Sequence, residues 1–244
     1  MRIPRVHVAE PLAPGIALLL SGQTAEHLTR VLRLGSGNAL VLFNGDGGAY
    51  SGAIADVSRR GVRVTVGDAL PDRPVESPLH LTLAQSIARG EKMDWIVQKA
   101  TELGVAAIVP IVTERTEIRL DARRTERRLA HWQAVIVSAC EQSGRMRVPS
   151  LAPPQRLTDW IAGLDGTAGL RLALDPEAEL STRELERFER ASLVVGPEGG
   201  LSDVDLTALR SSGFRGLRLG PRILRVETAG VSALAALQAV HGDG

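Results

Sequence analysis

The sequence predicts an α/β protein with a small β-rich N-terminal domain and a larger domain built on a parallel sheet. Residues 1–70 carry short strand-like runs joined by tight turns, whereas the rest alternates short apolar runs with longer amphipathic segments. This alternation is typical of a parallel sheet, because a helix must carry the chain back between strands that run in the same direction. The proline-rich stretch "LPDRPVESPLH" separates the two patterns and indicates a linker. We therefore expect domains at residues 1–71 and 72–244.

Three strands and one helix are predicted in the N-terminal domain. The strand-like runs are "NALVLFNG", "AYSGAIADVS" and "GVRVTVGDA", and the turn "NGDGG" at 44–48 predicts a hairpin between the first two. The segment 24–35 has a helical pattern, and we expect this helix to end at Gly35. Short strands joined by tight turns favour a small barrel.

The larger domain is predicted to alternate strands and helices as far as its last residues. Its first strand, "LHLTLAQSI", precedes a helix over 91–104 whose apolar positions fall on one face. A second strand at 105–113 and a helix over about 121–142 follow. The remaining predicted elements are strands at 170–175, 192–196 and 217–220 and a final helix over 228–242.

The composition excludes several kinds of site. Because the net charge is +1, the chain has no strong overall attraction for nucleic acid, and RNA binding would need a local basic surface. Cys140 is the single cysteine, which excludes an internal disulfide and a cysteine-based zinc site and fits a reducing cytoplasm. The histidines lack metal-binding spacing, and no apolar run approaches the ~20 residues of a membrane helix. We therefore expect a cytoplasmic protein without a metal or a membrane segment.

The loop "GPEGG" at 196–200 lies between an apolar strand and a predicted helix. Its glycines permit positive φ and close approach to a ligand, and Ser202 and Asp205 form a capping-box pattern that starts the helix at about 203. The loop lacks the lysine of a P-loop and the spacing of a dinucleotide fingerprint. Glu198 disfavours an anionic ligand and suits one that offers hydroxyls or positive charge. Taken alone, the pattern is equally typical of an ordinary turn between a strand and a helix.

A second glycine-proline loop, "LGPRILRVETAG" at 219–230, favours a ligand pocket. Its apolar residues Ile223 and Leu224 can form a wall for a flat aromatic ring, and Arg222 and Arg225 flank them. Ligands of α/β sheets bind at the carboxyl ends of strands, where both loops and the segment "LALDP" are expected. The two glycine-proline loops therefore predict a pocket for an adenosine-like ligand.

Two groups of basic residues stand out. Of the 29 basic residues, only Lys92 and Lys99 are lysines. A GC-rich genome accounts for most of the arginine, but two lysines in one segment also fit a place where a guanidinium would not. The second group fits either a solvated helix face or a surface that contacts RNA phosphates; it consists of Arg123, Arg124, Arg127 and Arg128.

Seven motifs in one order resemble a known family. They are "MRIPRVHV", "HLTRVLRLGSG", "RGEKMDWIVQKATELGV", "ERT", "CEQSGR", "GPEGGLS" and "LGPRILRVETA", and they run nearly from end to end. In this order the chain resembles the RsmE-type methyltransferases of the SPOUT superfamily, which act on uridine N3 of small-subunit (16S) ribosomal RNA. The last two motifs are highly specific as a pair. The resemblance implies a PUA-like RNA-binding β-barrel at 1–71 and a SPOUT α/β domain with a trefoil knot at 72–244.

The resemblance also implies S-adenosylmethionine as methyl donor, a homodimer, and the small ribosomal subunit as partner. Uracil N3 must lose a weakly acidic proton as it attacks the methyl group, so we expect a cation near the uracil oxygens and a proton acceptor. The expected catalytic residues are Arg145, Arg225 and Glu141, with Glu198 as an alternative acceptor. The expected cofactor-binding residues are Leu174, Gly196, Glu198, Gly199, Gly200, Leu219, Gly220, Ile223, Leu224 and Thr228. The expected RNA-binding residues are Arg2, Arg5, Arg30, Arg33 and Lys92.

Two alternative functions stay open at this point. One is a knotted methyltransferase that acts on another RNA, and the other is a non-catalytic RNA-binding assembly factor that keeps the pocket as part of its fold. The barrel-like N-terminal domain and the helix at 91–104 argue against an enzyme of transfer RNA ribose. The complete set of loops argues against the assembly factor.

Overall fold

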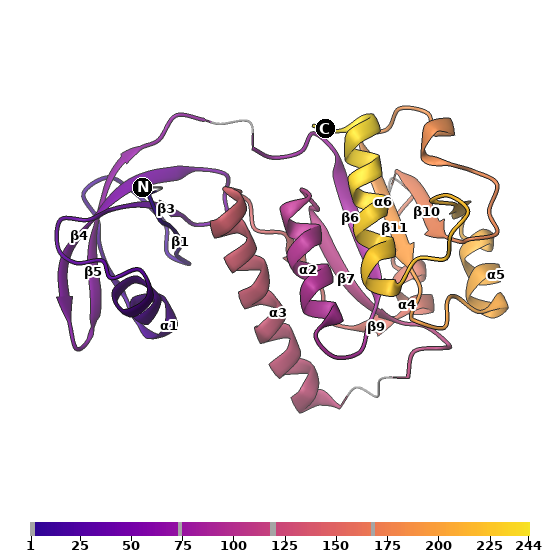
Figure 1. Ribbon diagram of the computed structural model, residues 1–244, viewed down its shortest axis with the longest axis horizontal. Helices are drawn as coiled ribbons and strands as arrows, with labels where there is room; N and C mark the ends of the chain where they lie inside the picture. The colour runs from indigo at the N-terminus through magenta and orange to yellow at the C-terminus, as the bar shows by residue number, and fades with distance from the viewer. Residues whose placement is uncertain (1–2, 73–74, 118–120, 167–168) are drawn as a thin grey trace. The chain divides into compact units, whose positions relative to one another are not determined.

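The chain divides into two compact units, whose elements are drawn in Figure 1. The computed structural model describes residues 3–72, 75–117, 121–166 and 169–244. The first unit comprises Met1–Glu76 and Cys140–Val148, and the second comprises Ser77–Ala139 and Pro149–Gly244. The prolines predict a boundary near residue 72, whereas the contacts divide the chain after Glu76. They also assign the later segment 140–148 to the first unit, which no local sequence signal indicates.

The first unit is built on a five-stranded sheet with the strand order β1-β3-β4-β5-β2. Strand β1 runs parallel to β3, and the other neighbours are antiparallel. The predicted hairpin is confirmed, because β3 and β4 pair across the turn at 44–48. Alternate side chains of the sheet, such as Leu42, Val62 and Val64, are fully buried in the core of this unit. The strands are β1 (Arg5–His7), β2 (Ala17–Leu20), β3 (Ala39–Phe43), β4 (Ala49–Ser58) and β5 (Gly61–Ala69).

The helix predicted over 24–35 differs from the observed one. Helix α1 (Gly22–Glu26) passes into a π-helical turn, η1 (His27–Val31), in which the N–H of Leu32 donates to the carbonyl oxygen of His27 at 3.0 Å. The chain leaves the helix before Gly35 because Arg33 adopts a left-handed conformation with φ of 55°. The expected glycine stop at Gly35 is therefore wrong.

The second unit contains the predicted parallel sheet, with the strand order β12-β10-β11-β6-β7-β8. Each of its recorded pairings is parallel, and the short strand β9 also pairs with β7. The strands are β6 (His80–Ser86), β7 (Ala107–Val112), β8 (Ser150–Leu151), β9 (Gln155–Arg156), β10 (Leu170–Leu174), β11 (Arg190–Val195) and β12 (Arg215–Leu217). The strand predicted at 217–220 is misplaced, because β12 ends at Leu217 and the following residues form a loop.

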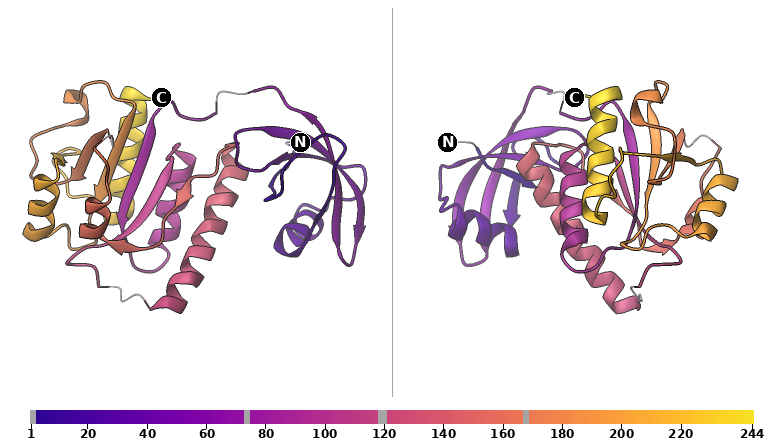
Figure 2. Two further views of the ribbon diagram at one scale, coloured as in Figure 1. Left: turned by 180° about the vertical axis from the view of Figure 1, so that it is seen from behind. Right: turned by 45° about the vertical axis from the view of Figure 1, so that its right-hand side comes forward.

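Helices cover both faces of this sheet (Figures 1 and 2). On one face, α6 packs against α2 and against strands β6 and β11, and Gly230 lets the helix approach the side chains of Leu83 and Val195. On the other face, α4 and α5 enclose an apolar cluster that includes Ala84, Trp160 and Phe214. The helices are α2 (Lys92–Glu102), α3 (Ala122–Ser143), α4 (Leu157–Ala162), η2 (Thr182–Glu184), α5 (Asp203–Ser211) and α6 (Val226–His241).

Candidate active site

A pocket of about 650 Å³ opens in the second unit at the carboxyl ends of β10, β11 and β12. Three segments contribute most of its lining: 174–177 after β10, 195–203 after β11 and 217–226 after β12. Because parallel strands end at the same edge of a sheet, loops that are far apart in sequence meet here. The volume lies within the range of pockets that hold small organic ligands.

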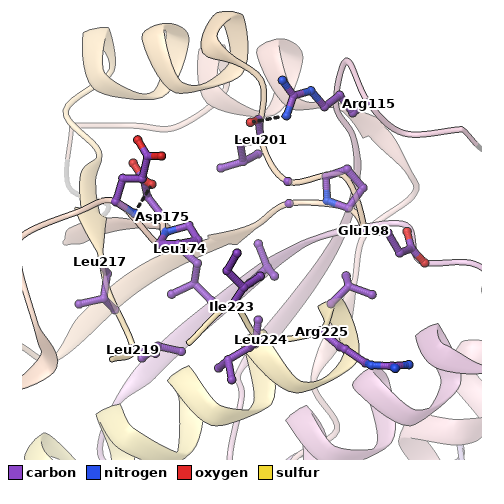
Figure 3. A pocket seen from close by; sticks show the side chains of 18 of the residues that line it. Arg115, Leu174, Asp175, Glu198, Leu201, Leu217, Leu219, Ile223, Leu224 and Arg225 are labelled. Carbon is purple, nitrogen blue, oxygen red and sulfur yellow. Dashed lines mark hydrogen bonds between the residues drawn. The ribbon is translucent and has the colours of Figure 1, made fainter. Parts of the chain in front are cut away.

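One wall of the pocket is apolar. In Figure 3 the side chains of Leu174, Leu219, Leu224 and Ile223 lie near one another along the pocket, with Leu217 beside them. Ile223 is 87% exposed, although burying an apolar side chain of this size away from water is favourable. An apolar side chain held open at a pocket rim suits contact with a flat, apolar part of a ligand.

Charged groups stand on opposite sides of this apolar wall. Figure 3 shows Asp175 on one side and Glu198 with Arg225 on the other. The Oδ1 atom of Asp175 accepts a hydrogen bond from the backbone N–H of Glu177 at 2.9 Å, and its Oδ2 atom lies 3.7 Å from Nη2 of Arg210. The pocket therefore offers an apolar centre between polar ends, which suits a ligand with the same distribution of groups.

The loop at 196–200 has the shape that its glycines predict. Gly200 adopts φ of 71°, and its N–H donates to the carbonyl oxygen of Pro197 at 2.9 Å, which closes the turn. A Cβ atom on Gly196 would lie 2.8 Å from the backbone nitrogen of Leu201. The predicted capping box is confirmed, because the Ser202 hydroxyl accepts from the N–H of Asp205 and α5 begins at Asp203. The backbone of this loop is therefore held close to the pocket.

Arg115 belongs to the "ERT" motif at 114–116 and also binds this loop, a contact that the sequence does not predict. Its Nη1 atom donates to the carbonyl oxygens of Gly199 at 2.8 Å and of Leu201 at 3.4 Å, and the second of these bonds is drawn in Figure 3. The loop after β7 thus fixes the loop after β11 through backbone oxygens, which any residue supplies. No sequence pattern indicates such a contact.

Glu198 is held as a carboxylate at the pocket. Its Oε1 atom accepts hydrogen bonds from the backbone N–H of Arg89 at 3.3 Å and from Nζ of Lys92 at 3.2 Å. Burial alone raises the pKa of Glu198, but its own backbone N–H, the N–H of Arg89 and the Lys92 ammonium outweigh burial and hold the pKa below its ordinary value. A negative charge therefore stands at the edge of the pocket at neutral pH.

Comparison with known protein families identifies the family to which this chain belongs. Residues 75–238 match the RNA methyltransferase domain, and residues 20–67 match the RNA methyltransferase PUA domain. The chain belongs to the RsmE-type RNA methyltransferase family. The resemblance found in the motifs is thereby confirmed, as is the expected combination of a PUA domain with a SPOUT-type α/β domain.

Relatives of this family match the chain over nearly its whole length. The ribosomal RNA small subunit methyltransferase E of Buchnera aphidicola (subsp. Acyrthosiphon pisum) is 30% identical over 99% of this chain and 95% of its own length. A putative methyltransferase of Legionella pneumophila, solved with bound S-adenosylmethionine, is 37% identical with a TM-score of 0.95 over 100% of both chains. The ribosomal RNA small subunit methyltransferase E of Neisseria gonorrhoeae, also bound to S-adenosylmethionine, is 33% identical with a TM-score of 0.91 over 99% of both chains.

The structure brings most of the predicted cofactor-binding residues together. Gly199 and Thr228 are not among the residues that line the pocket, whereas Arg225 and Lys92, predicted for other roles, are. The predicted residues that line it are Leu174, Gly196, Glu198, Gly200, Leu219, Gly220, Ile223 and Leu224.

The sequence did not indicate several lining residues. Asp175 and Glu177 follow β10 directly, so the rule that ligands bind at strand ends identifies their loop but not their side chains. Leu206 and Ala229 lie inside helices, where an apolar residue is indistinguishable from any other core position.

The expected catalytic residue Arg145 lies in the first unit, where it is tightly paired. It is 5% exposed, and its Nε and Nη2 atoms donate to Oε2 of Glu76 at 3.0 and 2.8 Å. The Oε1 atom of Glu76 accepts from the backbone N–H groups of Met146 and Arg147 at 2.8 and 2.9 Å. Arg145 is not among the residues lining the pocket. We call these four residues the Glu76 cluster.

Glu141 also belongs to the first unit and does not line the pocket. Its Oε1 atom accepts a hydrogen bond from the backbone N–H of His7 at 3.0 Å, and burial raises the pKa of its carboxyl above the ordinary value. Burial likewise raises the pKa of the Cys140 thiol to about 11, so this thiol is protonated at neutral pH. The catalytic assignments of Glu141 and Arg145 stay predictions.

The predicted RNA-binding residues of the first unit differ in exposure. Arg5 donates from Nη2 to the carbonyl oxygen of Arg145 at 3.2 Å and stacks over the Phe43 ring at 5.1 Å. Arg30 is exposed and lies 3.5 Å from Glu26, and Arg33 is exposed in its left-handed turn. Arg2 lies outside the described residues.

Two further findings concern the described part of the chain. Within it, no group of three or more His, Cys, Asp or Glu side chains is arranged to hold a metal ion. No helix among those residues has the length and apolar character needed to cross a membrane.

Proposed function

We propose that this protein transfers a methyl group from S-adenosylmethionine to N3 of a uridine in small-subunit (16S) ribosomal RNA. The observation that carries the proposal is the pocket formed by the two glycine-proline loops at the ends of β11 and β12. It lies in a chain whose relatives include small-subunit ribosomal RNA methyltransferases, one of them solved with S-adenosylmethionine, and a putative methyltransferase that is also solved with this cofactor.

The pocket residues fit this cofactor. Leu219, Ile223 and Leu224 offer an apolar surface for the adenine ring, and the Asp175 carboxylate can accept hydrogen bonds from hydroxyl groups. The ionised Glu198 favours a ligand with positive charge and disfavours one with phosphates. When bound, S-adenosylmethionine supplies a methyl group on a positively charged sulfonium.

The protein must also make uracil N3 a better nucleophile. The N3 atom carries a proton, and a cation near the uracil oxygens stabilises the anion that forms as this proton leaves. Arg225 is exposed and lines the pocket, so it is the cation we assign to this task. Arg145 and Glu141 remain candidates for a contribution to catalysis in the predicted homodimer. The Watson–Crick edge of the uracil must be unpaired during the reaction, because N3 is hidden in a base pair.

The first experiment asks which atom receives the methyl group. Purified protein, S-adenosylmethionine and small subunits from a strain that lacks the enzyme should give one methylated uridine, located by mass spectrometry of ribosomal RNA fragments. Methylation of a ribose oxygen or of another RNA class would contradict the proposal. Failure of the wild-type protein to bind S-adenosylmethionine in calorimetry would instead favour a non-catalytic assembly factor.

A variant tests the role of Arg225. Arg225→Ala should lower kcat on the order of 100-fold, because it removes a charge that stabilises the developing anion. Cofactor affinity, measured by calorimetry, should change little. Undiminished turnover with intact cofactor affinity would exclude Arg225 from this role.

A further inference from the structure

Lys92 joins two carboxylates that belong to different segments around the pocket. Its Nζ atom lies 3.2 Å from Oε1 of Glu198 and 3.6 Å from Oε2 of Glu227. Glu198 stands in the loop after β11, Glu227 stands in the first turn of α6, and Lys92 is the first residue of α2. One ammonium group therefore contacts both the glycine-proline loop after β11 and the first turn of α6, which follows the glycine-proline loop after β12.

The environment of Glu227 makes this contact more than an ordinary surface pair. Its side chain is 23% exposed, and its Oε2 atom is buried without a hydrogen-bond partner among the described residues. A buried carboxylate oxygen without a donor is costly unless a charge compensates it. Lys92, at 3.6 Å, is the cation that the structure places beside it.

The charge balance of this group argues against a contact with RNA phosphate. Lys92 contributes one positive charge and the two carboxylates contribute two negative charges, so the group as a whole is negative. An anionic phosphate is repelled by such a group, whereas a cationic ligand is attracted. Lys92 was predicted to bind RNA, and its partners favour another role.

We propose that Lys92 is a positioning residue that sets the Glu198 loop against the start of α6 and so shapes the cofactor pocket. The compact ammonium can approach two carboxylates from a single atom, whereas a guanidinium presents a wider planar fork. This explains why one of the two lysines of this arginine-rich chain stands here. The inference rests on the proposed function, because it takes the pocket as the S-adenosylmethionine site.

Calorimetric titration of the full-length protein with S-adenosylmethionine tests the proposal. Lys92→Met keeps most of the aliphatic stem but removes the charge, and should weaken cofactor binding about fivefold, since the three side chains are partly exposed and their attraction is screened. The KM for S-adenosylmethionine should rise by a similar factor, while the KM for RNA stays unchanged. Lys92→Arg should bind the cofactor with an affinity between that of the wild type and Lys92→Met.

Lys99 provides a matched control on the same helix. It is the other lysine of the chain, pairs with Glu102 at 2.8 Å and does not line the pocket. Lys99→Met removes the same charge from α2 and should leave cofactor affinity unchanged. If both lysine variants lose affinity equally, the effect is one of general charge and the positioning role is excluded.

A double variant separates positioning from an independent contact. In a Glu198→Gln background, Lys92→Met should lower cofactor affinity by less than it does in the wild type, because the ion pair with Glu198 is absent and only the contact with Glu227 remains to be lost. Equal losses with and without Glu198, or a loss of RNA affinity alone, would overturn the proposal. If the wild-type protein itself does not bind S-adenosylmethionine, the proposed function fails first, and that result differs from one in which only the Lys92 variants behave unexpectedly.

Discussion

The pocket of the second unit and the Glu76 cluster of the first unit each contain an arginine and a glutamate. The two pairs differ in how exposed the arginine is and in how many hydrogen bonds the glutamate accepts. At the pocket, Arg225 is exposed, and Oε1 of Glu198 accepts from the backbone N–H of Arg89 and from Nζ of Lys92. In the Glu76 cluster, Arg145 is 5% exposed and Glu76 accepts four hydrogen bonds through its two oxygens. An arginine near a glycine in a family motif can therefore either contact a ligand or stabilise the folded protein.

Whether a charged side chain is available to a ligand depends on how many hydrogen bonds it already makes within the protein. Glu76 joins the linker end of the first unit to the segment 140–148, which returns to this unit after the first part of the second. The Arg145 guanidinium is buried, and its Nε and Nη2 atoms both donate to Oε2 of Glu76. Such a charge-assisted pair is coupled to folding, because removing the carboxylate takes a charge partner away from a buried guanidinium. The pocket side chains instead leave apolar surface and charge exposed, which is what a binding site requires.

The largest expected effect comes from breaking the Glu76 cluster. Glu76→Ala removes the carboxylate that accepts from the Arg145 guanidinium and from two backbone N–H groups, and should lower the free energy of unfolding by about 3 kcal/mol. Urea denaturation of the wild type and the variant measures this change. Glu26→Ala, which removes an exposed pair with Arg30, is the control and should cost about 0.5 kcal/mol or less. Equal costs for the two variants would show that Glu76 has no special structural role.

A second expected effect concerns the backbone of the pocket loop. In Gly196→Ala, the new Cβ would meet the backbone nitrogen of Leu201 at 2.8 Å, so the loop must shift and S-adenosylmethionine affinity should fall about tenfold, or ~1.4 kcal/mol. In Gly199→Ala, the nearest atom is Cδ of Arg115 at 3.6 Å, an ordinary contact, and affinity should stay within about twofold. Calorimetry on both variants makes the comparison, and a larger loss in Gly199→Ala would contradict it.

The smallest expected effect concerns how the free energy of unfolding changes with pH. Glu141 and Glu198 should contribute to this change with opposite signs. Burial raises the pKa of Glu141, so the folded state binds this proton more tightly, and stability is lost as pH rises from the ordinary pKa of 4.5 through the raised value. For Glu198, hydrogen bonds and Lys92 overcome burial and lower the pKa, so its contribution is present above 4.5 and lost as pH falls through the lowered value.

Two isosteric variants measure this difference. Relative to the wild type at about pH 7, Glu141→Gln should raise the free energy of unfolding and Glu198→Gln should lower it, and both differences should shrink toward about pH 4. Glutamine keeps an oxygen that can accept the N–H of His7 or of Arg89 in each case. Urea denaturation across this pH range checks the signs, and the same sign for both variants would refute the assignment.

Much of the fold followed from local signals. The hairpin at 44–48, the amphipathic helix α2 and the capping box at Ser202 were predicted because each depends on residues close in sequence. The parallel sheet was predicted from the alternation of strands and helices along the chain. The helix end at Gly35 and the strand at 217–220 were wrong, because a left-handed Arg33 and the early end of β12 depend on neighbours that a local pattern does not contain.

The candidate site divides in the same way. Gly196, Glu198 and Leu224 were predicted because their loops carry motifs. Arg115 was missed because it binds carbonyl oxygens, which every residue has. Arg145 and Glu141 are expected in the site because they belong to the "CEQSGR" motif of the family it resembles, whereas the structure assigns them to the first unit.

The sequence by itself determined the order of elements, the two glycine-proline loops and the family of this protein, since these depend on residue types and their spacing. Only the tertiary structure decided which charges are available to a ligand. Whether a carboxylate already accepts several hydrogen bonds depends on distant donors. The Lys92 ammonium that donates to Glu198 is 106 residues away, and the donors to Glu76 are 69, 70 and 71 residues away. Such distant partners meet only when the strands and helices have packed, because hydrogen bonds and desolvation act over a few ångströms of space and not along the sequence.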